Sequence, residues 1–182
     1  MAKTRIAVIV GSLRKESFNR QLASTLPGLA PDVEFTQLRI DDLPPYNQDD
    51  DAAQPEAAKR LKSEIAAATG LIFVTPEYNR SMPGFLKNAI DHASRPYGQS
   101  AFKGKPAGVI GASIGAAGTA MAQQHLRNVL AYLDVPTLGQ PEVFIHVKEG
   151  VFVEPGKLGE STGKFLQGWM TTYLEFVRRH GG

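Results

Sequence analysis

The sequence contains no cysteine. This absence excludes disulfides, thiolate nucleophiles, CxxC redox motifs, iron–sulfur ligation and cysteine-based zinc sites. If the protein carries out redox chemistry, a bound cofactor must therefore supply it.

An excess of charge of one sign is also missing. There are 20 Lys and Arg against 18 Asp and Glu, so the formal net charge is +2. A balance this close gives no electrostatic reason to expect a nucleic-acid partner or a membrane surface. We therefore predict that the chain binds no nucleic acid.

Long runs of large apolar side chains are absent as well. Residues 106–126 carry no Lys, Arg, Asp or Glu, but they are rich in Gly, Ala and Ser, which does not describe a membrane-spanning helix. The apolar run at residues 5–10 is too short for a signal peptide. We therefore expect a cytoplasmic protein without membrane insertion.

What the sequence does contain is an ordinary globular composition. The chain has 182 residues, of which 42% are hydrophobic. This length predicts one domain over residues 1–182 with enough buried surface for a core of its own.

Strand and helix patterns alternate along the whole chain. Short apolar runs predict strands, and apolar residues at a spacing of three and four predict helices between them. A polar, proline-containing loop is expected at 41–54, and the apolar stripes, including Phe165 and Trp169, are expected to form the core. The expected strands are 5–10, 33–38, 71–74, 106–110 and 143–147, and the expected helices cover 18–29, 55–69, 85–93, 121–133 and 165–176. This alternation predicts an α/β fold with a five-stranded parallel sheet covered on both faces.

Ligands of such sheets bind beyond the carboxyl ends of the strands. The loop at 11–19 is the first candidate. Gly11 permits a tight turn, Ser12 and Ser17 offer hydroxyl groups, and Arg14 offers a guanidinium fork suited to phosphate. Ser17 also stands where a helix N-cap is expected. These features describe a phosphate cradle that is neither a P-loop nor a G-x-G-x-x-G motif; a polar loop before a capped helix is the alternative.

The second candidate loop covers residues 75–84. Pro76 and Pro83 restrict the backbone on either side of Tyr78 and Asn79, which lowers the entropy cost of presenting these side chains to a flat ligand. Asn79 and backbone groups can bond the edge of a heteroaromatic ring. The alternative interpretation is a rigid turn before a helix.

The third candidate loop, 111–118, consists mostly of small residues that allow a planar ligand to come close. It also matches G-x-S-x-G, the nucleophile elbow, with Ser113 as the nucleophile. Asp134 and His146 follow in the order that a serine hydrolase requires. No HGGG-type segment precedes the motif, and a hydrolase would leave the first two loops without a purpose. A serine hydrolase is nevertheless one alternative function.

Three segments together resemble one family. GSLRKESFNRQLA at 11–23, TPEYNRSMPGFLKNAIDHASR at 75–95 and SIGAAGTAMAQQHLRNVLAYLD at 113–134 resemble the NAD(P)H-dependent FMN reductases, and among them the bacterial quinone and chromate reductase branch. The resemblance extends to about residue 150 and more loosely to the last helix. It implies a flavodoxin-like doubly wound sheet of strand order 2-1-3-4-5 in three layers.

The resemblance also implies a cofactor site. The first loop would hold the FMN phosphate, the second would line the isoalloxazine ring, and the third would close over the other side of the flavin. No metal and no catalytic protein residue are implied. Two departures from the family pattern are Arg80 and Ala117. The implied cofactor-binding residues are Ser12, Arg14, Ser17, Phe18 through its backbone, Asn19, Pro76, Glu77, Tyr78, Asn79, Ser113 and Gly115.

The activity implied by the resemblance is a ping-pong reaction. NADPH or NADH would pass hydride to N5 of bound FMN, and a small-molecule electron acceptor would then take its place: a quinone, free flavin, chromate, an azo compound or a nitroaromatic. The alternative is a flavodoxin-type electron carrier, although such carriers are usually strongly acidic. The resemblance also implies a homodimer or homotetramer, with residues 85–95 and the stripe around Arg127 and Tyr132 as candidate contacts.

Overall fold

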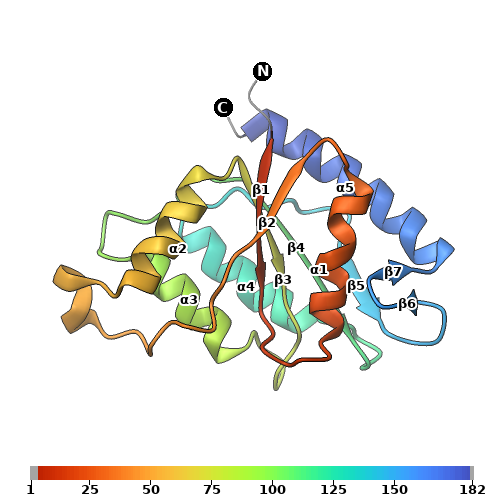
Figure 1. Ribbon diagram of the computed structural model, residues 1–182, viewed down its shortest axis with the longest axis horizontal. Coiled ribbons are helices and arrows are strands. Elements are labelled where there is room, and N and C mark those ends of the chain that lie inside the picture. The colour runs from red at the N-terminus through yellow and green to blue at the C-terminus, as the bar shows by residue number, and fades with distance from the viewer. Residues whose placement is uncertain (1–3, 181–182) are drawn as a thin grey trace.

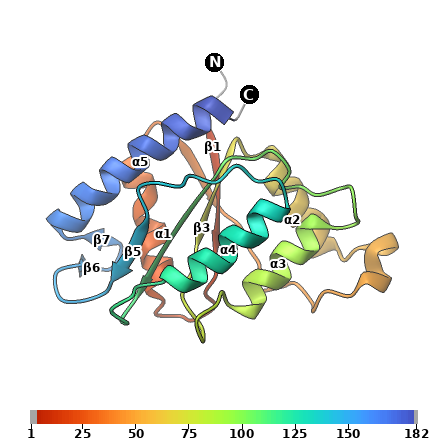
Figure 2. The same ribbon diagram turned by 180° about the vertical axis from the view of Figure 1, so that it is seen from behind.

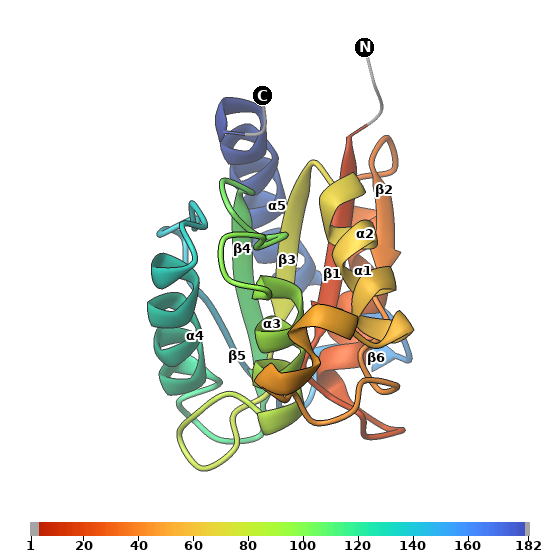
Figure 3. The same ribbon diagram turned by 90° about the vertical axis from the view of Figure 1, so that its left-hand side faces the viewer.

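The computed structural model describes residues 4–180. Its centre is a parallel sheet of five strands in the order β2-β1-β3-β4-β5, which confirms the predicted order. Figure 3 shows the strands running side by side, from the N-terminal end of β1 at the top toward a group of loops at the bottom. The strands are β1 (Arg5–Val10), β2 (Glu34–Gln37), β3 (Gly70–Val74), β4 (Ala107–Ser113) and β5 (Val143–His146).

Helices cover both faces of this sheet. Side chains of α1 (Phe18–Leu29) and α5 (Glu160–His180) form one core cluster with the sheet. Side chains of α2 (Glu56–Ala67), α3 (Gly84–Ser94) and α4 (Ala120–Tyr132) form the other. The view from behind places α3 and α4 in front of the sheet (Figure 2). The result is the predicted three-layer arrangement.

The central strands explain why the sequence pattern was informative. In β1, Ile6 and Val8 belong to one core cluster while Ala7 and Ile9 belong to the other, and all four are at most 3% exposed. A strand between two helical layers buries both of its faces, so it reads as a continuous apolar run.

The C-terminal helix contributes the largest buried side chains. Trp169 and Tyr173 of α5 are stacked with ring centroids 5.2 Å apart, and the Tyr173 hydroxyl donates to the Leu71 carbonyl at 2.8 Å. Burial raises the pKa of Tyr173 well above its ordinary value. The prediction that Phe165 belongs to the core was wrong, since it is 46% exposed. The buried stripe passes through Leu166, Trp169, Met170, Tyr173 and Val177, and Phe165 lies at its solvent edge.

Three local features differ from the sequence prediction. The expected 41–54 loop contains a 3-10 helix, η1 (Gln48–Ala53), which begins where the Asn47 side chain accepts from the backbone N–H of Asp49. β4 continues three residues beyond the predicted end, because Ser113 still pairs with His146 of β5. The third candidate loop therefore begins at residue 114.

An antiparallel hairpin, β6 (Phe152–Glu154) and β7 (Lys157–Leu158), was not predicted at all. Its Phe152 ring stacks on Phe18 at the start of α1, with centroids 6.3 Å apart. Within residues 4–180, no helix is both long enough and apolar enough to cross a membrane.

Candidate functional site

Three loops meet at the carboxyl edge of the sheet, as predicted. The N–H of Gly11, at the start of the first loop, donates to the Val74 carbonyl at 2.8 Å, and the N–H of Thr75 donates to the Ile110 carbonyl at 3.0 Å. These backbone hydrogen bonds join the end of β1 to the end of β3, and the end of β3 to the end of β4. The first loop (11–17), the second loop (75–83) and the third loop (114–119) consequently lie next to one another.

The first loop has the properties of an anion cradle. Ser17 is the N-cap of α1, and its hydroxyl accepts from the N–H of Arg20 at 3.3 Å, which confirms the predicted cap. Apart from a turn at Lys15 and Glu16, the backbone N–H groups from Ser12 to Asn19 have no hydrogen-bond acceptor within residues 4–180. Arg14 is exposed and makes no ion pair with any residue of 4–180. Unpartnered N–H groups, a helix N-terminus and a guanidinium in one loop fit a phosphate group.

The Asn19 side chain is hydrogen-bonded to the end of β4. Its Nδ2 donates to the Ala112 carbonyl at 2.8 Å, and its Oδ1 accepts from the Ala112 N–H at 3.0 Å. Asn19 is 3% exposed. The side chain therefore completes the hydrogen bonding of the end of β4 and fixes the first turn of α1 beside it, while the backbone N–H of Asn19 still points out of the helix end.

Arg20 was missed by the sequence analysis. Its Nε donates to the Ser12 carbonyl at 3.0 Å, so the side chain turns back over the first loop. Together with Ser12 and Arg39, it borders a cavity of about 270 Å³ beside the end of β2. An arginine in the first turn of an amphipathic helix gives no sequence signal for such a contact.

The second loop is a tight hairpin. The N–H of Tyr78 donates to the Ser81 carbonyl at 2.8 Å, and the N–H of Ser81 donates to the Tyr78 carbonyl at 3.0 Å. Asn79 and Arg80 between them have φ values of 50° and 66°, the signature of a two-residue turn of type I′. Asn tolerates this left-handed conformation, whereas Arg adopts it at an energetic cost. The turn leaves the Tyr78 ring 47% exposed.

Glu77 links the second loop to the helix that follows the third. Its Oε2 accepts from the N–H groups of Met121 and Ala122 at 3.1 and 3.2 Å. The N-cap residue of α4, Thr119, supplies no side-chain cap of its own. A carboxylate at a helix N-terminus is stabilised by the helix dipole. Glu77 therefore caps α4 from a loop 44 residues earlier in the chain, a role the sequence analysis did not assign to it.

A second contact joins the same two segments. Nδ1 of His125 on α4 lies 3.0 Å from the Ser81 hydroxyl. The second loop is thus attached to α4 at two points, and its position relative to the third loop is set by these contacts.

The second and third loops enclose a cavity of about 560 Å³, which we call the slot cavity. Four of the predicted site residues line it, while Pro76 and Tyr78 do not. The small side chains of the third loop keep it open. Its lining consists of Glu77, Asn79, Arg80, Ser113, Ile114, Gly115, Ala116, Ala117 and Gly118.

Of the alternative hydrolase triad, Ser113 and His146 pair across β4 and β5, but Asp134 is not brought to them. The Ser113 hydroxyl accepts from the N–H of Gly115 at 3.1 Å. Asp134 follows α4, whose 13 residues carry the chain about 20 Å toward the opposite edge of the sheet. There the Asp134 carbonyl accepts from Gly104. An acid, a base and Ser113 therefore form no relay in this fold.

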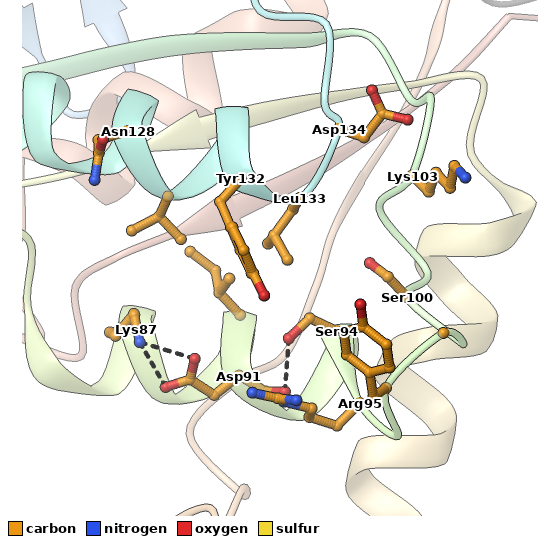
Figure 4. A pocket seen from close by; sticks show the side chains of 14 residues that line it. Lys87, Asp91, Ser94, Arg95, Ser100, Lys103, Asn128, Tyr132, Leu133 and Asp134 are labelled. Atoms are coloured by element: carbon orange, nitrogen blue, oxygen red, sulfur yellow. Dashed lines mark hydrogen bonds and ion pairs between the residues drawn. The ribbon is translucent and has the colours of Figure 1, made fainter.

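Another cavity lies away from these loops. A groove of about 590 Å³ runs between α3 and α4, and Tyr132 of α4 points across it toward α3 (Figure 4). Lys87 and Asp91 form an ion pair on its α3 side at 2.8 Å. Tyr97 and Tyr132 at this groove are 83% and 79% exposed. Arg127, a predicted subunit contact, donates to the Leu138 carbonyl at 2.8 Å. Within the described part of the chain, no cluster of three His, Asp or Glu side chains could hold a metal ion.

Comparison with known proteins places these features in a family. The family model described as NADPH-dependent FMN reductase matches residues 4–150. A 2-hydroxy-1,4-benzoquinone reductase of a Burkholderia species is 53% identical over 176 residues, which is 96% of each chain. An NAD(P)H-dependent FMN reductase of Pseudomonas aeruginosa is 43% identical over 181 residues, covering 98% of this chain and 97% of that protein.

A solved structure gives the same result. The flavoenzyme FerB of Paracoccus denitrificans, an NAD(P)H:(acceptor) oxidoreductase, is similar with a TM-score of 0.93 at 45% identity, covering 97% of this chain and 98% of that one. The predicted family resemblance is confirmed. The chain belongs to the NADPH-dependent FMN reductase family and is an oxidoreductase with FMN as its cofactor and NAD(P)H as its co-substrate.

Proposed function

We propose that the protein uses NAD(P)H to reduce quinones and related flat acceptors at the carboxyl edge of its sheet. When bound, FMN supplies the hydride chemistry. The observation that carries the proposal is the placement of the unpartnered N–H groups of the first loop beside the slot cavity. The names of the relatives, quinone reductase and 2-hydroxy-1,4-benzoquinone reductase, support a quinone acceptor. Chromate, free flavin, azo compounds and nitroaromatics are further acceptors to assay.

The roles of the chain's own residues follow from their positions. In the first loop Ser12, Arg14, Ser17 and the N–H groups of Phe18 and Asn19 would bind the phosphate. In the second loop Pro76, Tyr78 and Asn79 would line the ring, and Glu77 would hold this loop against α4. Ser113 and Gly115 would close the other side. Holding donor and acceptor close and oriented is how such a site lowers the barrier.

The phosphate assignment is tested by Arg14→Ala. Loss of a charged hydrogen bond to phosphate is expected to weaken FMN binding by about 1–3 kcal/mol. Titration of apoprotein with FMN, followed by quenching of flavin fluorescence, measures the change in Kd. Lys15→Ala removes a neighbouring exposed cation and is expected to change the Kd much less. Unchanged FMN affinity in Arg14→Ala would contradict the assignment.

The reaction itself is tested on the purified holoenzyme. Anaerobic NADPH should bleach the yellow absorption of the bound flavin, and a quinone added afterwards should restore it. An electron carrier of the flavodoxin type would stay oxidised after NADPH is added. A protein that takes up no FMN at all would overturn the proposed function.

We also propose that a second copy of the chain covers the groove between α3 and α4. The groove has two exposed tyrosines at its rim, and it presents both signs of charge through Lys87, Asp91, Arg95, Lys103 and Asp134. A surface with both signs can pair with itself about a two-fold axis, giving a homodimer or, by a second contact, a homotetramer. Tyr132→Glu is expected to shift the protein to monomer in sedimentation velocity. An unchanged sedimentation coefficient would place the interface elsewhere.

A further inference from the structure

The slot cavity is lined by one cationic side chain, Arg80, and one carboxylate, Glu77. The rest of its lining is small or uncharged. The net charge that a ligand meets there depends on how far these two neutralise each other.

The negative charge of the Glu77 carboxylate is already compensated by the start of α4. Its side chain is 8% exposed, and one of its oxygens accepts two N–H groups at the positive end of α4. Arg80 reaches the other oxygen with Nη1 alone, at 3.2 Å. The carboxylate therefore has two sources of positive charge, and Arg80 is left with positive charge in excess.

The remaining donors of Arg80 are available to a ligand. Its Nε and Nη2 have no hydrogen-bond partner in the chain between residues 4 and 180, and the side chain is 71% exposed. The backbone at this position has a φ of 66°, where glycine would be free of strain. A long cationic side chain thus occupies the tip of a turn that favours glycine, at the mouth of the slot cavity.

We propose that Arg80 makes this site selective for flat acceptors that are anionic at neutral pH, above all ring-hydroxylated quinones in their ionised form. A hydroxyl group on a quinone ring is a vinylogous carboxylic acid, so it loses its proton readily. The charge is then shared with the carbonyl oxygen at ring position 4, while the ionised oxygen itself lies beside the carbonyl oxygen at position 1 in the plane of the ring. Two such oxygens side by side match the guanidinium fork as a carboxylate does.

This inference rests on the proposed function and does not alter the reaction. NAD(P)H loses a hydride and becomes NAD(P)+, and the quinone anion gains that hydride together with two protons from solvent to become the neutral hydroquinone. Arg80 touches the oxygens that stay on the ring. It binds and orients the acceptor, and it transfers no proton.

The test compares two acceptors that differ mainly in charge. 2-Hydroxy-1,4-naphthoquinone is ionised at neutral pH, and 2-methyl-1,4-naphthoquinone is neutral. In the holoenzyme, Arg80→Gln is expected to lower kcat/KM for the anion about tenfold and to leave the neutral quinone within about twofold, a charged hydrogen bond discounted for exposure. Arg80→Lys should keep part of the preference. Wild-type kcat/KM for the anion should also fall as salt is added.

Binding without turnover provides an independent readout. The Kd of the hydroxylated quinone for oxidised holoenzyme, measured by flavin fluorescence in the absence of NAD(P)H, should rise about tenfold in Arg80→Gln. Arg5→Gln is the matched control, since Arg5 is also an exposed arginine in an ion pair, with Glu34 at 3.6 Å, but lies at the amino end of β1. It should change neither quantity.

The outcomes separate the inference from the function on which it rests. An equal loss for both quinones would show that Arg80 serves only the turn, and unchanged selectivity would show that it meets no acceptor; either result overturns the inference while the reductase activity stands. Wild-type protein that reduces neither quinone would overturn the proposed function and the inference together.

Discussion

Replacement of Asn19 by alanine is expected to lower the free energy of unfolding by about 4 kcal/mol and to abolish stable FMN binding. The side chain makes two hydrogen bonds with the backbone of Ala112, at 2.8 and 3.0 Å, in a buried environment. Alanine leaves both the N–H and the carbonyl of Ala112 without a partner. Each buried unsatisfied group costs about 1–3 kcal/mol.

The loss of FMN binding follows from the position of these bonds. Asn19 belongs to the first turn of α1, which presents the unpartnered N–H groups of the first loop, and Ala112 precedes Ser113 at the end of β4. Without the side chain, the first loop and the slot cavity are no longer held at a fixed position relative to each other. A ligand that spans both would then have to supply the ordering itself, which weakens its binding.

Urea unfolding of the apoprotein and FMN titration measure the two effects. Thr25→Ala is the matched control, because Thr25 is buried in the same helix but its hydroxyl donates only to the Leu22 carbonyl one turn away. Asn19→Asp keeps the acceptor for the Ala112 N–H and should fall between wild type and alanine. A loss below about 1 kcal/mol in Asn19→Ala would show that water replaces the side chain without cost.

The strands of the sheet were predictable because their signals are local, whereas the strand order was implied by the family resemblance. Leu71–Val74 is an uninterrupted apolar run, and it is buried on both faces in β3. Where the local sequence pattern for a strand is weak, tertiary contacts determine the structure. Residues 111–113 carry no β-branched side chain, yet they continue β4 because β5 pairs with them. Likewise, the hairpin at Phe152 is stabilised by the stacking of this ring on Phe18, a contact that the local sequence does not show.

In the candidate site, too, local contacts could be predicted from the sequence and contacts between distant residues could not. The cap at Ser17 could be read from the sequence, because a cap bonds to a residue three positions away. The partners of Asn19 and Glu77 could not, because Ala112 and Met121 lie 93 and 44 residues further along the chain. A sequence shows that a polar residue stands in a loop, and only the fold shows which backbone group it meets. For both residues the family resemblance implied contact with the flavin, and the fold adds that their side chains are hydrogen-bonded to the protein.

The second large effect is expected from the hydrogen bonds by which Glu77 caps α4. Glu77→Ala is expected to destabilise the protein by about 2–3 kcal/mol, since it removes a carboxylate that accepts two N–H groups at the start of α4 and pairs with Arg80. The first turn of α4 then has no cap, because Thr119 provides none. Within residues 4–180, the hydrogen bond between Ser81 and His125 then remains as the polar contact of the second loop with α4.

Hydrogen exchange on the apoprotein measures this effect without any flavin. In Glu77→Ala, the amides of Met121 and Ala122 should lose protection, while those of the last turn of α4 keep theirs. FMN affinity should also fall about tenfold or more, since the slot cavity is no longer held at one width. Glu77→Gln retains an acceptor oxygen without the charge, and it should restore part of the protection.

Glu56→Ala is the control that distinguishes the specific capping of α4 by Glu77 from the general effect of a negative charge near a helix N-terminus. Glu56 stands in the first turn of α2 and pairs with Lys59, but its side chain is 88% exposed. Its removal should cost less than about 0.5 kcal/mol and leave FMN affinity unchanged. If Glu77→Ala behaves like Glu56→Ala, the carboxylate of Glu77 is only a favourable charge near a dipole. If it exposes the start of α4 and weakens FMN binding together, one side chain sets the distance between the two loops that enclose the ring.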